Sequence, residues 1–355
     1  MVCRTAVVFS QKYYRHNPGR THPESAKRLY SIITDVEKHR SSEKERWRFI
    51  EPVKASIAEV ELVHGLEYIK LVEAVCRNGG GLLDLGDTVV SPESYEVALY
   101  AVGGTLRAVK LVAKNEFENA FAFVRPPGHH ASKFRACGFC IFNNVAISAE
   151  YLVRKLGLER VVILDIDAHH GNGTQESFYQ SDRVLYVSLH EDPTGFPGTG
   201  FAGEIGEAAG LGYTVNVPLP YGTSDQVYLK AFDEIVDPIV RDYAPQFLLV
   251  SAGLDGHYSD PVGQLALSAS CYGQVYDRIL RLAREVCHGK VVSVLEGGYS
   301  LRWVGRIGGE IVCKLSGESC GVSDKRPMPN VGVSRQGEKA IREVRKIQGP
   351  YWKIK

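Results

Sequence analysis

The sequence predicts an α/β protein of three layers, in which helices cover both faces of a parallel sheet. Five short apolar runs rich in β-branched residues recur, and each is followed by turn residues and then by a longer helical pattern. They are AFAFV at 120–124, VVILDID at 161–167, VLYVSL at 184–189, FLLVSA at 247–252 and VVSVLE at 291–296. Buried parallel strands read as continuous apolar runs joined by helical crossovers, so this alternation favours a sheet covered on both sides.

Three segments between these runs have helical patterns, namely 144–156, 226–241 and 271–286. Pro238 falls inside the second segment, and because proline lacks a backbone N–H we expect it to kink or split that helix. No low-complexity linker or internal repeat divides the chain, so we expect residues 1–355 to form a single domain. The tail from Ser323 is more polar, and its Tyr351 and Trp352 are expected to pack against the body.

The composition is that of a soluble protein with a large core, because hydrophobic residues make up 44% of the 355 residues and charged residues 23%. The 42 basic and 41 acidic residues nearly cancel, so no overall charge attracts nucleic acid or an anionic membrane. No apolar run reaches the roughly 18 residues that a membrane span needs. We therefore expect neither a direct nucleic-acid partner nor a membrane.

The eight cysteines are expected to be reduced, because the chain has no secretory apolar segment at its start. This favours a cytoplasmic location, or a nuclear one if the source is eukaryotic. One close pair, Cys137 and Cys140, has the CxxC spacing found in zinc and redox sites. Because neither a second CxxC nor a βαβ redox context accompanies the pair, we interpret both residues as small buried hydrophobic side chains.

Each chemically reactive motif begins where one of the five apolar runs ends. RPPGHH follows the first run, DIDAHHGNG closes the second, SLHEDP the third, SAGLDGH the fourth and LEGGY the fifth. A single His or Asp at a strand end is usually a capping or turn residue. Ligands of an open parallel sheet bind outside the carboxyl ends of its strands, so five such segments together predict one cleft.

Asp165, Asp167 and Asp255 lie beside strongly apolar sequence, where an unpaired carboxylate is costly to bury and a bound cation would remove the cost. Asp165 and Asp167 point to the same side of an extended strand, and His169 continues the spacing if the strand persists. Two carboxylates and one imidazole leave an open metal position, as in a catalytic zinc site. The oxygen-rich ligand set also suits Mn²⁺ or Fe²⁺.

His129 and His130 in PPGHH are candidate bases, because imidazole titrates near neutral pH and neither ring is needed as a metal ligand. The alternative is that both are structural histidines that hydrogen-bond the turn. Tyr299 follows Gly297 and Gly298, which permit unusual backbone angles, and its phenol can donate a hydrogen bond to a developing oxyanion. The Gly-Gly-Tyr turn alone does not identify this role.

Taken together, these motifs resemble the histone deacetylase and acetylpolyamine amidohydrolase superfamily, which shares its fold with arginase. The resemblance extends from HPESAKRL at 22–29 to PYWK near the end of the chain. Its most specific segments are RPPGHHA, GFCIFNNVA, DIDAHHGNGTQ, FPGTG, SAGLDGHYSDP and LEGGY. The resemblance implies a three-layer α-β-α fold around a central, mostly parallel, eight-stranded sheet.

The same resemblance implies two cation sites. The catalytic zinc ligands of the family correspond here to Asp167, His169 and Asp255. A buried K⁺ or Na⁺ in the family has ligands that correspond to Asp165, Asp167, His169 and Ser188. We therefore expect one divalent metal ion with a monovalent cation close to it.

The resemblance also implies catalytic roles. His130 resembles the general base and acid, His129 its tandem partner, and Tyr299 the phenol that polarises the substrate carbonyl. Asp165 resembles the carboxylate that accepts a hydrogen bond from His129. Asn172 follows the pattern of class II and many prokaryotic members, whereas another branch has Asp there to pair with His130. An amide stabilises an imidazolium less than a carboxylate does, so the base should have a lower pKa here.

Other positions match the walls and exits of the family's active site. The narrow acyl tunnel of the family corresponds here to Gly138, Phe139 and Phe196. Arg28 resembles an arginine near the internal cavity through which acetate is thought to leave. Asp87 matches a rim carboxylate that grips the substrate backbone, in a loop that varies among relatives.

The function that the resemblance implies is zinc-dependent hydrolysis of an acyl group from the ε-amine of lysine in a protein or peptide. An acetylpolyamine or another small N-acyl amine is the alternative substrate, and an acidic entrance would favour it. Candidate acids for such an entrance are Glu24, Glu191 and Asp192. A two-manganese ureohydrolase resembling arginase and a non-catalytic binder of acylated ligands are further alternatives. Monomer and homodimer both remain open.

Overall fold

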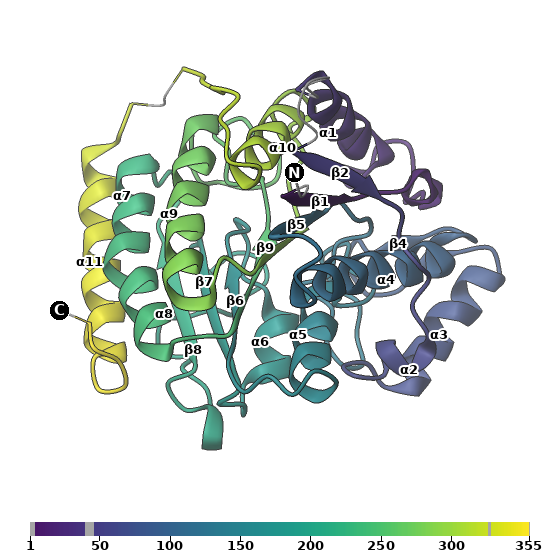
Figure 1. Ribbon diagram of the computed structural model, residues 1–355, viewed down its shortest axis with the longest axis horizontal. Coiled ribbons are helices and arrows are strands. Elements are labelled where there is room, and N and C mark those ends of the chain that lie inside the picture. Colours follow the sequence, from purple (N-terminus) through teal and green to yellow (C-terminus); the bar gives the residue numbers. More distant parts are fainter. Residues whose placement is uncertain (1–3, 40–45, 326–327, 355) are drawn as a thin grey trace.

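The computed structural model describes residues 4–39, 46–325 and 328–354, which fold around an eight-stranded sheet (Figure 1). The strands lie in the order β2-β1-β5-β10-β9-β6-β7-β8, and every neighbouring pair is parallel. They are β1 (Thr5–Val8), β2 (Trp47–Ile50), β5 (Asn119–Ala122), β6 (Val161–Asp165), β7 (Val184–Glu191), β8 (Thr214–Leu219), β9 (Phe247–Ala252) and β10 (Val291–Leu295). A separate antiparallel pair comprises β3 (Gly81–Leu82) and β4 (Val89–Val90). The predicted α/β fold is confirmed.

Helices cover both faces of the sheet, as the sequence predicts (Figure 1). One layer contains α1 (Ala26–Lys38), α7 (Asp225–Ala231), α8 (Asp237–Tyr243), α9 (Ala269–Cys287), α10 (Leu301–Leu315) and, at the β8 edge, α11 (Val331–Gln348). The other layer contains α2 (Ile57–Val60), α3 (Leu66–Arg77), α4 (Ser94–Ala113), α5 (Asn144–Arg154) and α6 (Asn172–Phe178). A short 3₁₀ helix follows β1 at Gln11–Arg15. Within the described chain, no helix combines the length and apolar character of a membrane span.

The helix α9 illustrates how the spacing of apolar residues in the sequence determines which face of a helix packs against the sheet. Its buried side chains recur three or four residues apart, at Tyr272, Tyr276, Ile279 and Ala283. This spacing places them on one face of the helix, toward the sheet. Full burial of a large apolar side chain contributes about 1.5–3 kcal/mol, so such faces dominate the packing energy. The hydroxyl of Ser268 accepts a backbone hydrogen bond and fixes the start of this helix.

The predicted helix at 226–241 is split, as its proline suggests. The structure has α7, then a π-helical turn at Phe232–Val236, and then α8, whose first turn contains Pro238. A π-helical turn inserts an extra residue into the hydrogen-bond ladder, and proline is tolerated in a first turn because its missing N–H is not needed there. The chain therefore stays helical through the segment with a local change of pitch.

The strand β6 is shorter than predicted. It ends at Asp165, so Asp167 and His169 lie on the loop that follows and do not continue the strand's alternation. The expectation that His169 extends the strand spacing is wrong. A strand keeps side chains two positions apart roughly 7 Å from each other on one face, whereas a loop lets Asp167 and His169 turn toward the same point.

The tail contains a helix that the sequence pattern did not predict, α11, and it ends against the body. The indole Nε1 of Trp352 donates a hydrogen bond to the carbonyl of Gly212 at 2.8 Å. The same indole packs edge-on against Tyr213 and Tyr243. The ring of Tyr351 lies over Gly212, where an added Cβ would come within 2.7 Å of it. The predicted packing of both aromatic residues is confirmed.

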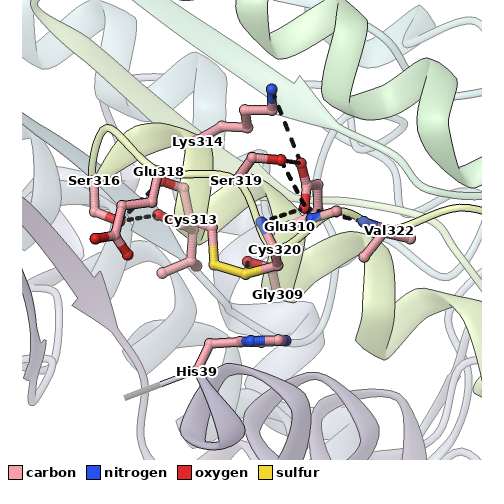
Figure 2. Close-up of a disulfide and its surroundings, with 12 residues drawn as sticks. His39, Gly309, Glu310, Cys313, Lys314, Ser316, Glu318, Ser319, Cys320 and Val322 are labelled. Atoms are coloured by element: carbon pink, nitrogen blue, oxygen red, sulfur yellow. Dashed lines mark hydrogen bonds and ion pairs between the residues drawn. A yellow bond between two sulfur atoms is a disulfide. The ribbon is translucent and has the colours of Figure 1, made fainter. Parts of the chain in front are cut away.

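The expectation that the cysteines are reduced is wrong for one pair. Cys313 in the last turn of α10 and Cys320 in the following loop form a disulfide, with Cα atoms 6.0 Å apart (Figure 2). The chain reverses direction between them, which brings two residues only seven positions apart within bridging distance. Cys137 and Cys140 are free, and Cys140 is buried as interpreted from the sequence. Cys3 lies outside the described residues.

Candidate active site

The five reactive motifs converge at the carboxyl end of the sheet. They surround a cavity of about 250 Å³. Its lining residues are Asp87, Pro127, His129, His130, Gly138, Phe139, Cys140, Asp167, His169, Glu191, Phe196, Val262, Gln264, Gly297 and Tyr299. Except for Asp87, which lies between β3 and β4, these residues come from the end of β7 and from the loops after β5, β6, β7, β9 and β10, so the parallel topology itself assembles most of the site.

Three predicted ligands meet at the base of this cavity. One ligand atom from each of Asp167, His169 and Asp255 lies within 4.8 Å of the others. The Nδ1 atom of His169 is 3.0 Å from Oδ2 of Asp255 and 3.3 Å from Oδ1 of Asp167. All three side chains are buried. Two carboxylates and one imidazole at this spacing suit a divalent ion that keeps a position open for substrate.

The backbone is shaped to hold these carboxylates. Gly297 donates its N–H to Oδ2 of Asp167 at 2.8 Å, and Ala168 donates its N–H to Oδ1 of Asp255 at 2.9 Å. A Cβ at Gly297 would lie 2.4 Å from Oδ2 of Asp255, and one at Gly253 would lie 2.1 Å from Oδ2 of Asp167. Only glycine lets the backbone approach so closely. The donors orient the carboxylates, and the residues present fit a metal ion.

The charges in the cluster also favour a cation. Burial and the neighbouring charge of Asp167 raise the pKa of Asp255 to about 7. Burial disfavours a charged imidazole, but the hydrogen bonds with Asp167 and Asp255 raise the pKa of His169 well above its ordinary value. Two adjacent buried carboxylates resist being ionised together unless positive charge lies between them. A divalent metal ion supplies that charge.

The ring of His129 is held by a carboxylate. Its Nδ1 lies 3.0 Å from Oδ2 of Asp165, which also accepts a hydrogen bond from the hydroxyl of Tyr186 at 3.1 Å. Although burial favours the neutral ring, the charges of Asp165 and Asp167 raise the pKa of His129 to about 10. His129 therefore favours the protonated form.

The ring of His130 is held by an amide. Its Nδ1 lies 2.8 Å from Oδ1 of Asn172, so Nδ1 carries the hydrogen and Nε2 is left as the basic atom. The two tandem rings are 3.9 Å apart. Burial and the adjacent charge of His129 lower the pKa of His130 well below its ordinary value. His130 is therefore neutral and able to accept a proton.

Tyr299 lies across the cavity on a fixed turn. The carboxylate of Asp260 accepts hydrogen bonds from the backbone N–H of Tyr299 at 2.6 Å and of Ser300 at 2.9 Å. The guanidinium of Arg28 lies 4.8 Å from the centre of the Tyr299 ring, and the Phe139 ring meets it edge-on. Burial raises the pKa of Tyr299 well above its ordinary value. The phenol therefore keeps its proton and can act as a donor.

The predicted tunnel residues line the cavity. Phe196 packs edge-on against the ring of His130, with centroids 4.9 Å apart. Gly138 has φ +52°, and an added Cβ would lie 2.4 Å from His130 and 2.9 Å from Phe196. Phe139 also has a positive φ of +68°, which is uncommon for a residue with a bulky side chain. Phe139 lines the same cavity as Phe196, and its ring meets that of Tyr299 edge-on.

The residues matched to a monovalent cation lie next to the divalent cluster. Asp165 and Ser188 are partners in the β6–β7 register, and Asp167 and His169 follow Asp165 on the loop. The hydroxyl of Ser188 is hydrogen-bonded to Nδ1 of His190 at 2.8 Å. Asp165 accepts the backbone N–H of Asp167 at 3.2 Å. Asp165 thus lies beside both Ser188 and Asp167, and Asp167 in turn contacts His169.

Arg28 lies beneath the site, and Glu24 is its partner. The Nε of Arg28 donates to the carbonyl of Gly298 at 2.6 Å, and a second nitrogen pairs with Glu24 at 3.1 Å. The carboxylate of Glu24 also pairs with Arg125 at 2.5 and 2.7 Å, and all three side chains are fully buried. The suggestion that Glu24 is an acid at the entrance is therefore wrong. Its charge is neutralised inside the protein.

The other candidate acids differ in position. Asp87 is exposed at the edge of the cavity, where burial of part of its carboxyl group raises its pKa. Glu191 is buried in the wall, with Oε1 3.7 Å from Nε2 of His169 and Oε2 accepting the N–H of Gln264 at 2.6 Å. Asp192 does not line the cavity, and its carboxylate accepts hydrogen bonds from Thr194. One acid thus lies at the rim and one in the wall.

Two structural carboxylates were not assigned a role from the sequence. Glu296 is buried and accepts the backbone N–H of Gly128 at 2.7 Å and of His129 at 3.2 Å. It therefore fixes the turn that presents the tandem histidines. Asp260 holds the turn of Tyr299 in the same way. Both residues stand inside the motifs LEGGY and SAGLDGHYSDP, so the signal was present, but only the fold reveals which backbone each one meets.

Comparison with known proteins agrees with this geometry. The Histone deacetylase domain family matches residues 22–315. A probable deacetylase of Archaeoglobus fulgidus is 45% identical over 297 residues, which are 84% of this chain and 82% of that protein. A histone deacetylase-like amidohydrolase of Pseudomonas aeruginosa is 36% identical over 302 residues, or 85% of this chain and 78% of that protein.

Comparison with solved structures agrees with the sequence comparison. The crystal structure of the HDA15 HD domain aligns with a TM-score of 0.89 at 33% sequence identity, over 99% of this chain and 96% of that one. The matched family covers most of the chain, including the metal cluster, both tandem histidines and Tyr299. The chain therefore belongs to the histone deacetylase family, a family of deacetylase enzymes.

Proposed function

We propose that this chain is a zinc-dependent amidohydrolase that removes acetyl or other acyl groups from the ε-amine of lysine in proteins or peptides. One observation carries the proposal. A buried cluster of Asp167, His169 and Asp255 faces one cavity with a neutral histidine, His130, and a protonated phenol, Tyr299. Metal ligands, a base and an oxyanion donor are the parts that hydrolysis of an unactivated amide requires.

We assign the metal ion to Asp167, His169 and Asp255. When bound there, zinc would polarise the substrate carbonyl and lower the pKa of a water molecule. The backbone donors that orient both carboxylates support a site built for an ion. Zinc is the first choice because three ligands with one open position are typical of catalytic zinc, and Fe²⁺ or Mn²⁺ remain the alternatives for an oxygen-rich set.

His130 is proposed as the general base and then the general acid. Its Nδ1 is engaged by Asn172, so Nε2 accepts the proton as water attacks the carbonyl carbon. Phenolic donation by Tyr299 stabilises the negative oxygen that forms as the C–O bond is made. His130 then returns the proton to the leaving nitrogen as the C–N bond breaks. The products are a carboxylate and a free amine.

His129 and Asp165 are proposed to support this chemistry. The carboxylate of Asp165 fixes the ring of His129, whose charge lowers the pKa of the neighbouring His130. We further propose that K⁺ or Na⁺ binds near Asp165, Asp167, His169 and Ser188. Such an ion would help to balance the buried carboxylates on the side away from substrate.

The shape of the cavity supports an acyl-lysine substrate. Phe139 and Phe196 border a space of about 250 Å³, which suits an unbranched chain better than a bulky group. Asp87 at the rim can accept hydrogen bonds from a peptide backbone. An acetylpolyamine is the second candidate, favoured by the acidic side chains of Asp87 and Glu191, although the burial of Glu24 removes one acid from the entrance.

The tests begin with the metal and the substrate. Elemental analysis of the purified protein should find one catalytic divalent ion per chain, whereas two would favour a ureohydrolase resembling arginase. The zinc-loaded protein should hydrolyse acetyl-lysine or longer acyl-lysine peptides faster than acetylpolyamines. The reverse order would replace the proposed substrate, and binding of acyl-lysine without turnover would favour a non-catalytic binder.

The role of Tyr299 is tested by Tyr299→Phe, which removes only the hydroxyl. Loss of one oxyanion donor should lower kcat about a hundred- to a thousandfold, while the metal content stays unchanged. Tyr221→Phe is the matched control, because that phenol donates to the carbonyl of Asp192 outside the catalytic cluster, and its kcat should stay near the parent value. Near-parental turnover of Tyr299→Phe would refute the role.

A further inference from the structure

A segment after α10, residues 316–325, runs back along that helix and is named here the strap. Its near end is fixed by the Cys313–Cys320 disulfide (Figure 2). The buried carboxylate of Glu310 on α10 accepts a hydrogen bond from the hydroxyl of Ser319 at 2.8 Å and from the backbone N–H of Cys320 at 2.9 Å. These contacts hold the strap against α10 over its first half.

The far end of the strap reaches the metal-binding loop. Oδ2 of Asp324 lies 2.8 Å from Nε2 of His257, and both side chains are fully buried. Both oxygens of Asp324 also lie 3.1 Å from the backbone N–H of Ala269, the first residue of α9. His257 stands two positions after the predicted ligand Asp255. A residue of the strap thus supports the loop that carries a metal ligand.

The hydrogen bonds of His257 define its role. The backbone N–H of Ser259 donates to Nδ1 of His257 at 3.2 Å, so Nδ1 is an acceptor. Nε2 then carries the hydrogen and donates it to Asp324. The imidazole is stacked on Trp303, with centroids 5.1 Å apart. These three contacts therefore fix the position and the tautomer of the ring, and among the described residues Asp324 is the acceptor of its N–H.

The loop in turn holds the turn that carries Tyr299. The carbonyl of His257 accepts the N–H of Asp260 at 2.8 Å, and the carboxylate of Asp260 accepts the N–H of Tyr299 at 2.6 Å. A second link joins the hydroxyls of Ser259 and Ser300 at 3.2 Å. A continuous set of contacts therefore runs from Asp324 through His257 to the backbone of Tyr299.

From these contacts we infer that Asp324 is a positioning residue for the Tyr299 turn and acts through His257. The inference rests on the proposed role of Tyr299 as oxyanion donor. Asp324 lies beyond residues 22–315, the part of the chain that matches the deacetylase family. The strap therefore supports the phenol, and the Glu310 contacts and the disulfide hold that support in place.

The test compares Asp324→Ala with Asp324→Asn in the full-length, metal-loaded protein. Loss of the acceptor lets the turn of Tyr299 shift, and a displacement of this kind should lower kcat about ten- to a hundredfold. KM and the metal content should change little, because neither the cavity walls nor the ligands are altered. The amide of Asp324→Asn keeps one acceptor oxygen and should restore part of kcat.

Asp225→Asn is the matched control. Asp225 accepts hydrogen bonds from the N–H and the hydroxyl of Ser268 at the start of the same helix, α9, as Asp324 does from Ala269. This variant should lower thermal stability as Asp324→Ala does but leave kcat of the folded protein near the parent value. Equal kcat for Asp324→Ala and Asp225→Asn would overturn the inference and leave Asp324 as a helix cap.

Combination with Tyr299→Phe separates this inference from the proposed function. In the Tyr299→Phe background, Asp324→Ala should lower kcat by no more than about twofold, because residues that act as a unit are not additive. A full additional loss would overturn the inference. If Tyr299→Phe itself keeps near-parental turnover, the proposed role of the phenol fails, whatever Asp324→Ala does.

Discussion

The surroundings of the two tandem histidines differ although the residues are adjacent in the chain. His129 faces the buried carboxylate of Asp165, whereas His130 faces the amide of Asn172 and the cavity. Their pKa values move in opposite directions. Burial opposes charge on both rings, but Asp165 raises the pKa of His129 to about 10, while burial and the charge of His129 lower the pKa of His130.

This contrast shows how one residue type can serve two purposes. A ring paired with a buried carboxylate stays protonated and fixed in orientation. A ring paired with an amide stays neutral and can exchange a proton. The difference depends on the partners and not on the histidines themselves. Substitution of each ring and of each partner therefore tests this division of roles directly.

The largest effect is expected from His130→Ala. Removal of the base should lower kcat about a hundred- to ten-thousandfold, because general acid–base catalysis contributes on that order. The free energy of unfolding should fall by about 1–3 kcal/mol, less than for a broken buried ion pair, since the partner left behind is the neutral amide of Asn172. Steady-state kinetics and thermal unfolding of the metal-loaded protein measure both quantities.

The variant to compare with His130→Ala is His129→Ala. It leaves the buried carboxylate of Asp165 without its imidazole, so both stability and kcat should fall. If His130→Ala were the less stable of the two variants, or kept turnover within a few-fold of the parent, the division of roles between the rings would be wrong.

A smaller effect is expected when the two partners are removed. Asp165→Ala should lower the free energy of unfolding by about 3–5 kcal/mol, because it breaks a buried ion pair and removes the acceptor of the hydrogen bond that the Tyr186 hydroxyl donates. Asn172→Ala removes one neutral hydrogen bond and should cost about 0.5–1.5 kcal/mol. Denaturant unfolding of both variants with metal bound measures the difference, and equal costs would contradict it.

Much of the fold could be predicted because buried parallel strands leave a strong pattern. All five predicted runs are strands of the sheet. The strands β1, β2 and β8 were not predicted, because the apolar run of β1 is only four residues long, β2 is interrupted by Arg48, and β8 contains Asn216 and Pro218. Short strands carry too few residues for a pattern, and their pairing is decided by neighbours far away in sequence.

The site was predictable where function depends on residues close in sequence. The motifs at the strand ends meet in one cavity, because parallel strands bring their carboxyl ends together. The burial of Glu24 was not predictable, since its partner Arg125 lies 101 positions away. The contact of Asp324 was not predictable either, because its partner His257 is 67 positions away. Long-range polar contacts leave no local pattern.

The smallest and most specific effect is expected from Asn172→Asp, which gives His130 a partner like that of His129. A carboxylate stabilises the protonated ring, so the pKa of His130 should rise. His130 must be neutral to accept a proton, and the acidic limb of kcat/KM should therefore move to higher pH, by about one unit.

The pH dependence of kcat/KM, measured from about pH 5 to pH 9, tests this shift. Asn78→Asp introduces the same charge at an exposed position at the end of α3 and should leave the limb in place. A limb that stays fixed in Asn172→Asp would mean that the amide does not tune the base. A limb that moves to lower pH would contradict the assignment of His130 as the base, because a carboxylate beside its ring can only raise the pKa of that ring.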